Sequence, residues 1–219
     1  MLLSIETATN VCSVAFRDRE GKQIEKRTNK RGSHSELLFL FIEELMEEHG
    51  LKIPELEGVL VSKGPGSYTG LRISASAVKG LLFQTQVPLY AVDTLASYAM
   101  QAATEREVVG TIHSVIDARR QHLYHQKFQW EQGALRTYDQ TEVRPIDNVE
   151  KMIEAGDIVV GTGLKRLDAE VRDKATLLDS HAITARSLID LYEAEAENFF
   201  KQVDPESFDP SYYTSSQVQ

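Results

Sequence analysis

Residues 61–81 read VSKGPGSYTGLRISASAVKGL, which joins the end of an apolar, β-branched run to a glycine-rich turn and then to a helix of mostly small residues. A strand, a turn and a helix in this order can hold a phosphate on the amides of the helix N-terminus. We expect Pro65 and Gly66 to occupy the second and third positions of a type II turn, because the third position needs a positive φ. Ser67 or Thr69 is then placed to cap the helix.

The spacing of the glycines fits neither of two common phosphate-binding motifs. The P-loop ends in Gly-Lys followed by Ser or Thr, which this stretch lacks. Gly64, Gly66 and Gly70 follow G-x-G-x-x-x-G instead of the dinucleotide pattern G-x-G-x-x-G. A tight connection between strand and helix is therefore the favoured interpretation. A residual nucleotide or anion site stays open as the alternative, with the candidate residues Glu6, Thr7, Gly66, Ser67 and Thr69.

The flanking sequence predicts a ribonuclease-H-like α/β lobe. Apolar runs at residues 1–6 and 11–17, and a third around 23–28, are typical of strands, and residues 33–50 are typical of a helix. A capping box of Ser33 and Glu36 begins this helix, and Gly50 suits its C-terminal end. Further strands lie on either side of the glycine-rich turn and its helix, at residues 58–62 and 87–92. The order β-β-β-α-β-α-β predicts a mixed sheet flanked by helices.

The second half of the sequence predicts a smaller α/β lobe. We expect lobes of residues 1–100 and 101–219. The second has predicted strands near residues 113–118, 122–130, 134–141 and 157–161, a short helix at 148–156 and a long one at 184–203. The acidic stretch from residue 204 to the C-terminus is expected to run along the surface.

Composition and charge limit the classes of function. The chain has 219 residues, one cysteine and a net charge of −9, so it forms no internal disulfide and its overall field repels nucleic-acid phosphates. No apolar run approaches the roughly 20 residues that cross a bilayer, and the chain begins with strand-like residues instead of a leader. We therefore expect a cytoplasmic protein that contacts RNA only with the help of another chain.

Two helices carry more apolar or small residues than one core face needs. Small residues recur at three- or four-residue spacing on the helix after the turn, which allows close packing against either a partner or the chain's own sheet. The helix at 33–50 has apolar residues outside its main core face, a sign of a subunit contact. The predicted partner surface consists of Leu37, Phe39, Leu40, Met46, Gly70, Ile73, Ser74, Ala77 and Gly80.

The sequence offers no recognisable catalytic group. No two histidines are four residues apart as in a helical metal site, and His122 and His125 are expected on opposite faces of a strand, at the surface. Cys12 is expected to be an inert core residue. We therefore predict no catalytic residue, no metal and no cofactor.

Four motifs in matching order resemble the TsaB family, a bacterial subunit of the machinery that makes tRNA threonylcarbamoyladenosine. They are IETATNVCSVAF at residues 5–16, HSELL at 34–38, SKGPGSYTGLRI at 62–73 and IDARRQHLY at 116–124. The chain departs from the family at Ser74, where a glycine is usual, and in its PSYYTSS ending, where tyrosine-leucine-arginine is commoner. The resemblance implies a two-lobed actin-like ATPase fold with a reduced second lobe.

The resemblance also implies a role in a complex. TsaB-like proteins pair with the catalytic paralogue TsaD, which carries a metal through paired histidines, and with the ATPase TsaE. The complex transfers a threonylcarbamoyl group to the adenosine beside the anticodon of tRNAs that read codons starting with A. In the family the first two helices form the interface, and the same surface forms homodimers when TsaD is absent.

Two functions from different classes follow. The first is a non-catalytic subunit that stabilises and activates TsaD. The alternative is an enzyme of the same superfold, either an ATP-dependent phosphotransferase or a glycoprotease-like hydrolase. Fold alone does not separate them, but the missing histidine pair, the degenerate phosphate loop and the acidic charge favour the subunit.

Overall fold

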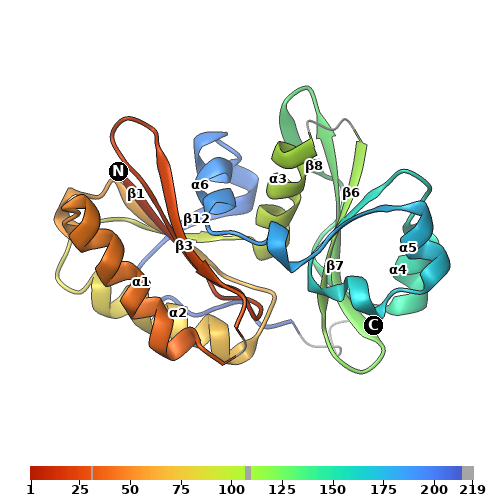
Figure 1. The fold of residues 1–219 in the computed structure, drawn as a ribbon, viewed down its shortest axis with the longest axis horizontal. Coiled ribbons are helices and arrows are strands. Elements are labelled where there is room, and N and C mark those ends of the chain that lie inside the picture. The colour runs from red at the N-terminus through yellow and green to blue at the C-terminus, as the bar shows by residue number, and fades with distance from the viewer. Residues whose placement is uncertain (31, 107–109, 214–219) are drawn as a thin grey trace. The chain divides into compact units, whose positions relative to one another are not determined.

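The computed structural model in Figure 1 describes residues 1–30, 32–106 and 110–213, and it divides into two compact units. The first contains Met1–Asp93 and Thr184–Ser211, and the second contains Thr94–Ile183 together with Tyr212 and Tyr213. The expected second lobe of residues 101–219 is corrected accordingly. The chain returns to the first unit at Thr184, because a strand near the C-terminus pairs with the first unit's sheet.

The first unit has a mixed six-stranded sheet with the order β12-β5-β4-β1-β2-β3. Its strands are β1 (Leu2–Glu6), β2 (Cys12–Arg17), β3 (Gln23–Thr28), β4 (Gly58–Ser62), β5 (Leu89–Val92) and β12 (Phe200–Val203). The first three form an antiparallel meander, and β4 and β5 continue the sheet parallel to β1. This order and these directions confirm the ribonuclease-H-like α/β prediction.

Helices cover both faces of this sheet (Figure 1). The helices α1 (His34–His49) and α2 (Tyr68–Leu81) lie side by side on one face, and α6 (Arg186–Glu193) packs against β1, β2 and β4. All residues of β1 and β4 are buried, as expected of central strands covered on both faces. A short 3₁₀ turn, η1 (Ile53–Glu55), precedes β4, and another, η4 (Glu197–Phe199), precedes β12.

The glycine-rich turn differs from the expected type II turn. The positive φ, 111°, belongs to Gly64, and the peptide bond between Gly64 and Pro65 is cis. Gly66 is required for another reason, because a Cβ there would lie 2.3 Å from the carbonyl oxygen of Ala8. Ser67 caps α2 as predicted, since its hydroxyl accepts a hydrogen bond from the amide of Gly70.

Other local predictions are corrected at the ends of elements. Ser33 precedes α1, but its hydroxyl donates to the carbonyl of Lys30 instead of capping the helix. Gly50 ends α1 in the left-handed conformation, as predicted. The long helix expected over residues 184–203 is wrong, because α6 ends at Glu193 and the chain turns at Glu195, whose φ is 52°.

The C-terminal stretch is held more closely than the sequence indicates. Phe208 and Pro210 are buried in the first unit, where Phe208 joins the apolar core beneath α1 and α2. The amide of Ser211 donates to the carbonyl of Lys63 at 2.7 Å, just before the glycine-rich turn. The expectation of a stretch lying only along the surface is therefore wrong for these residues.

The second unit repeats the strand order of the first in smaller form. Its path is β11-β10-β6-β7-β8, with β6, β7 and β8 antiparallel and with β10 and β11 parallel to β6, while β9 pairs separately with β7. The strands are β6 (Gly110–Asp117), β7 (His122–Glu131), β8 (Ala134–Thr137), β9 (Glu142–Pro145), β10 (Ile158–Val160) and β11 (Thr176–Leu178).

Short helices account for the smaller size of the second unit. Its helices α4 (Ile146–Met152) and α5 (Ala169–Lys174) have 7 and 6 residues, where α1 and α2 have 16 and 14. The helix α3 (Thr94–Arg106) packs against β6, β7 and β10. The 3₁₀ turns η2 (Thr162–Arg166) and η3 (Ser180–Ala182) complete the unit. The chain therefore has the two-lobed, actin-like ATPase fold with a reduced second lobe.

Two glycines of α2 provide a matched test of this packing. A Cβ at Gly70 would lie 2.1 Å from the carbonyl oxygen of Thr7, whereas a Cβ at Gly80 would meet nothing within 4 Å. We expect Gly70→Ala to lower the free energy of unfolding by about 1–3 kcal/mol through overpacking. Gly80→Ala should raise it by up to about 1 kcal/mol, because alanine is the better helix former. Urea unfolding measures both, and equal stability of the two variants would contradict the close contact.

Candidate functional site

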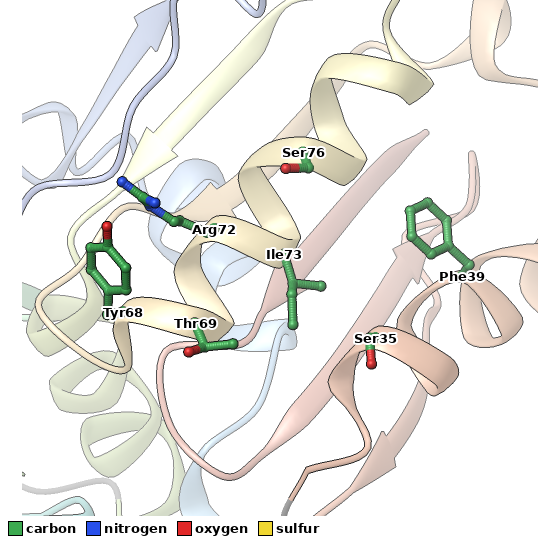
Figure 2. Close-up of a pocket in the computed structure, with 7 residues that line it drawn as sticks. All are labelled: Ser35, Phe39, Tyr68, Thr69, Arg72, Ile73 and Ser76. Carbon is green, nitrogen blue, oxygen red and sulfur yellow. The ribbon is translucent and has the colours of Figure 1, made fainter.

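A shallow groove lies between α1 and α2, with a volume of about 350 Å³. Figure 2 shows Ile73 pointing from α2 toward α1, where Phe39 and Ser35 lie on the opposite side. The lining residues come from these two helices and are Ser35, Phe39, Tyr68, Thr69, Arg72, Ile73 and Ser76.

The periodicity of α2 brings its part of the groove to the surface. Buried residues at positions 70, 71, 74, 75, 77 and 78 anchor the helix to the first unit. Positions 69, 72, 73 and 76 recur at the same three- or four-residue spacing on another face, and they line the groove. The groove therefore depends on the buried face of α2 being held in place.

The helix α1 supplies an exposed aromatic wall beside a complete core face. Leu38, Ile42 and Leu45 are buried against the sheet. Phe39 is 55% exposed and Leu40 is 42% exposed, although both are large and apolar. Large apolar side chains that remain exposed next to a filled core are typical of an interaction surface.

The chemistry of the groove suits binding. The guanidinium carbon of Arg72 lies 4.1 Å from the centroid of the Tyr68 ring, a cation–π arrangement that gives the cation a defined position. Ile73 is half-buried and packs against the core, so it forms an apolar floor. The seven lining residues include no carboxylate, histidine or cysteine. The groove thus offers an apolar surface with one positive charge at its side.

Only part of the predicted partner surface is exposed in the isolated chain. Phe39 and Ile73 line the groove, and Leu40 is exposed beyond its lining. Leu37 and Met46 are half-buried.

The stripe of small residues on α2 requires a correction. Ser74 and Ala77 are buried in this chain, and Gly70 packs against the carbonyl of Thr7. Only Gly80 is exposed, at the far end of the helix. These residues let α2 approach its own sheet closely, so Gly70, Ser74 and Ala77 do not form an open surface for another chain.

Four lining residues were missed by the sequence prediction, namely Ser35, Tyr68, Arg72 and Ser76. A signal for them exists, because Tyr68 and Arg72 are four residues apart and a helix places such residues one above the other. The prediction relied on the small residues instead, and these lie on another face of the same helix.

The candidate anion site has most of its groups engaged within the chain. The Thr7 hydroxyl donates to the carbonyl of Gly70 at 2.9 Å, and the amide of Ser67 donates to the carbonyl of Ala8 at 2.6 Å. The buried carboxylate of Glu6 accepts from the amide of Ala8. Thr69 faces the groove instead. These contacts hold the end of β1 tightly against the start of α2. They also place the carboxylate of Glu6 at a position where a phosphate-binding loop carries no carboxylate.

A polar cluster in the second unit was also missed. His125 is buried, and its ring contacts the ring of His113 and the guanidinium of Arg144. The prediction of a surface position for His125 is therefore wrong, whereas His122 is only half-buried. Burial lowers the pKa of His113, and burial together with nearby positive charge lowers the pKa of His125 well below the ordinary value.

Cys12 has the environment predicted for it. The side chain is buried, and burial with the nearby charge of Glu6 raises the pKa of its thiol to about 12. A thiol with such a pKa is not activated as a nucleophile. Across residues 1–30, 32–106 and 110–213, no three His, Cys, Asp or Glu side chains gather as metal ligands. The helices in these ranges include none with the length and apolarity to cross a membrane.

Comparison with known protein families finds a match that covers part of each unit. A family model described as TsaD, tRNA N6-adenosine threonylcarbamoyltransferase, matches residues 28–167. The tRNA threonylcarbamoyladenosine biosynthesis protein TsaB of Haemophilus influenzae is 31% identical over 123 residues, which make up 56% of this chain and 51% of that protein. The TsaB protein of Bacillus subtilis is 30% identical over 148 residues, 68% of this chain and 61% of that protein. The matched part of the chain thus spans between half and two thirds of these relatives.

Solved structures match over nearly the full length. An uncharacterized Pseudomonas aeruginosa protein with similarity to the peptidase YeaZ is 28% identical, with a TM-score of 0.81 over 97% of this chain and 99% of that chain. YeaZ from the same organism is 29% identical, with a TM-score of 0.80 over 96% of this chain and 98% of that chain. The similarity therefore covers both units.

The exposure of Phe39 and Leu40 can be tested by measuring the free energy of unfolding of variants of the isolated chain. We expect Phe39→Asp and Leu40→Asp to change the free energy of unfolding by less than about 1 kcal/mol, because both side chains are exposed and lie outside the buried core. Leu38→Ala, at the neighbouring buried position, should cost about 2–5 kcal/mol through loss of core packing. Chemical unfolding measures the free energy of unfolding of the three variants. A loss at Phe39 or Leu40 as large as that at Leu38 would show that these residues belong to the core.

Proposed function

This chain belongs to the TsaD family of tRNA N6-adenosine threonylcarbamoyltransferases and is of the TsaB type within it, and on that premise we propose that it acts as a non-catalytic subunit. In this proposal the chain binds a TsaD-like catalytic subunit through the groove between α1 and α2, and it stabilises and activates that subunit. The product is threonylcarbamoyladenosine beside the anticodon of tRNAs that read codons starting with A.

The observation that carries the proposal is the apolar groove with Phe39 on one side and Ile73 as its floor. Phe39 is 55% exposed, which leaves a large apolar area for a partner to cover. This groove thus has the chemistry of an interface, and its lining residues lack groups for proton transfer or nucleophilic attack.

Charge supports an indirect contact with tRNA. The net charge of the chain is −9, so the summed field opposes association with a polyanion. We therefore assign tRNA binding to the assembled complex and ATP turnover to a TsaE-like ATPase. A second copy of this chain can cover the same groove when the catalytic subunit is absent, because the same apolar surface then stays open in two identical chains.

Binding through the groove predicts a selective loss of affinity. We expect Phe39→Asp and Ile73→Asp to weaken binding to the TsaD-like protein of the same source by at least about 30-fold, since central interface residues often contribute 2 kcal/mol or more. Phe83→Asp is the matched control, because Phe83 is also an exposed aromatic residue, 64% exposed, and lies outside the groove. Calorimetric titration measures the three affinities. Equal affinities would place the interface elsewhere.

Reconstitution tests the accessory role itself. The isolated chain, given tRNA, ATP, threonylcarbamoyl-adenylate and magnesium or zinc, should form no modified adenosine, whereas the mixture with TsaD-like and TsaE-like proteins should form it. Mass spectrometry of the released nucleosides measures the product. Product from the isolated chain would contradict the non-catalytic role, and turnover of ATP or peptide by it would support the phosphotransferase or hydrolase alternative. Equal product without this chain would contradict the activating role.

A further inference from the structure

Four side chains form a continuous polar path inside the second unit. The Nη1 atom of Arg144 lies 2.7 Å from Nδ1 of His125, and Nε2 of His125 lies 2.9 Å from Nδ1 of His113. Nε2 of His113 lies 3.1 Å from Oδ2 of Asp157. Both histidines are fully buried. The path connects β9, β7 and β6 with the turn that follows α4.

The chemistry of the end groups fixes the direction of every hydrogen bond in this path. Arginine only donates, so Nδ1 of His125 is the acceptor and its proton is on Nε2. That proton is donated to Nδ1 of His113, which therefore carries its own proton on Nε2 and donates it to the Asp157 carboxylate. Both rings are thus neutral and in the same tautomer, with all four ring nitrogens used.

Charged groups around the path decide where an additional proton can be held. Asp157 faces His113, while Lys127 lies close enough to oppose a charge on either ring. Arg144 opposes a charge on His125 and has two further partners, since its Nη2 is 3.1 Å from Asp139 and its Nε is 3.0 Å from Glu142. Glu142 and Asp139 are more exposed than the two rings, so Arg144 keeps two carboxylate partners near the surface when it loses its contact with His125.

A single added proton breaks the path wherever it binds. On His125 it occupies Nδ1 and faces the guanidinium, so two donors and two positive charges oppose each other. On His113 it occupies Nδ1, and His125 can accept a hydrogen bond from it only by holding its own proton on Nδ1, where that proton faces the guanidinium. The network therefore has no arrangement in which a charged imidazole leaves the Arg144 contact intact.

We propose that the path from Arg144 through His125 and His113 to Asp157 is an acid-sensitive latch that fixes β9 on β7. Protonation of the histidine pair expels the Arg144 side chain, which stays with Glu142 and Asp139, and β9 then detaches locally from β7. The proton comes from solvent, and no bond other than hydrogen bonds changes. The latch is independent of the groove between α1 and α2.

The strand β9 is short and lies at an edge of its sheet. Its four residues pair with β7 alone, from Glu142 opposite His125 to Pro145 opposite His122. By contrast, β6 and β7 pair over eight positions from Gly110 to Asp117. Loss of the Arg144 contact removes the polar connection between β9 and the buried histidines and leaves the buried Val143 as the apolar attachment of the strand, so opening is expected there and not between β6 and β7.

Hydrogen exchange measured by mass spectrometry on the full chain tests the latch. We compare protection factors for peptides over residues 138–148 at pH 7.5 and 5.5, after correction for intrinsic exchange rates. A ring with an ordinary pKa near 6.5 in the open state takes up a proton over this range, which favours opening by about 10-fold. The closed state is thus fully stabilised above about pH 6.5 and loses stability as the pH falls. Peptides over β6 should keep their protection.

Two variants and one spectroscopic measurement make the test specific. His125→Gln, which does not titrate, should reduce the pH effect on residues 138–148 to less than about 2-fold, whereas His181→Gln, at an exposed histidine of the same unit, should leave it unchanged. In the unaltered chain, imidazole nitrogen NMR should show both buried rings neutral with Nε2 protonated at pH 7.5. A charged ring or the other tautomer at that pH, or equal protection of 138–148 at both pH values, would overturn the proposal.

Discussion

The first turn of α2 is pressed against the end of β1, and the position of the groove depends on this contact. The carbonyl oxygens of Thr7 and Ala8 occupy the space where side chains would lie at Gly70 and Gly66. Hydrogen bonds from the Thr7 hydroxyl to Gly70 and from the Ser67 amide to Ala8 connect the same segments. With α2 fixed in this way, its buried face is fully used, and its other face lies beside α1.

The sequence predicts the order of elements well, because that order follows from local signals. Alternating apolar residues, Gly50 at the end of α1 and Ser67 at the start of α2 act within a few residues of the structure that they define. Only some of the groove residues were predicted. Gly70 was assigned to the partner surface, but glycine is needed there because of the carbonyl of Thr7, which is far away in the sequence. A small side chain looks the same in the sequence whether it admits a partner or the chain's own backbone.

The buried histidines show a second limit of sequence reasoning. Strand periodicity correctly separates His122 from His125, but it does not indicate which face is covered or what lies across the sheet. His113 and His125 meet because β6 and β7 pair with Val115 opposite His125, a register that depends on the turn and on both strands. Arg144 then joins them from β9, which the sequence did not predict as a separate strand. Partners on three strands therefore form a site without a local motif.

The two units share a strand order, but they differ in the surface that their helices present. In the first unit, the long helices α1 and α2 pack one face into the core and still present Phe39 and Arg72 on an open face. In the second, α4 and α5 are too short to offer a comparable surface, and the notable chemistry lies inside. Phe39 and Ile73 supply apolar area to the groove, and Arg72 is held over Tyr68, so its charge has a defined position at a small cost in side-chain entropy. The chain thus combines a groove that has the surface chemistry of a protein contact with a net charge of −9, which opposes direct contact with nucleic-acid phosphates.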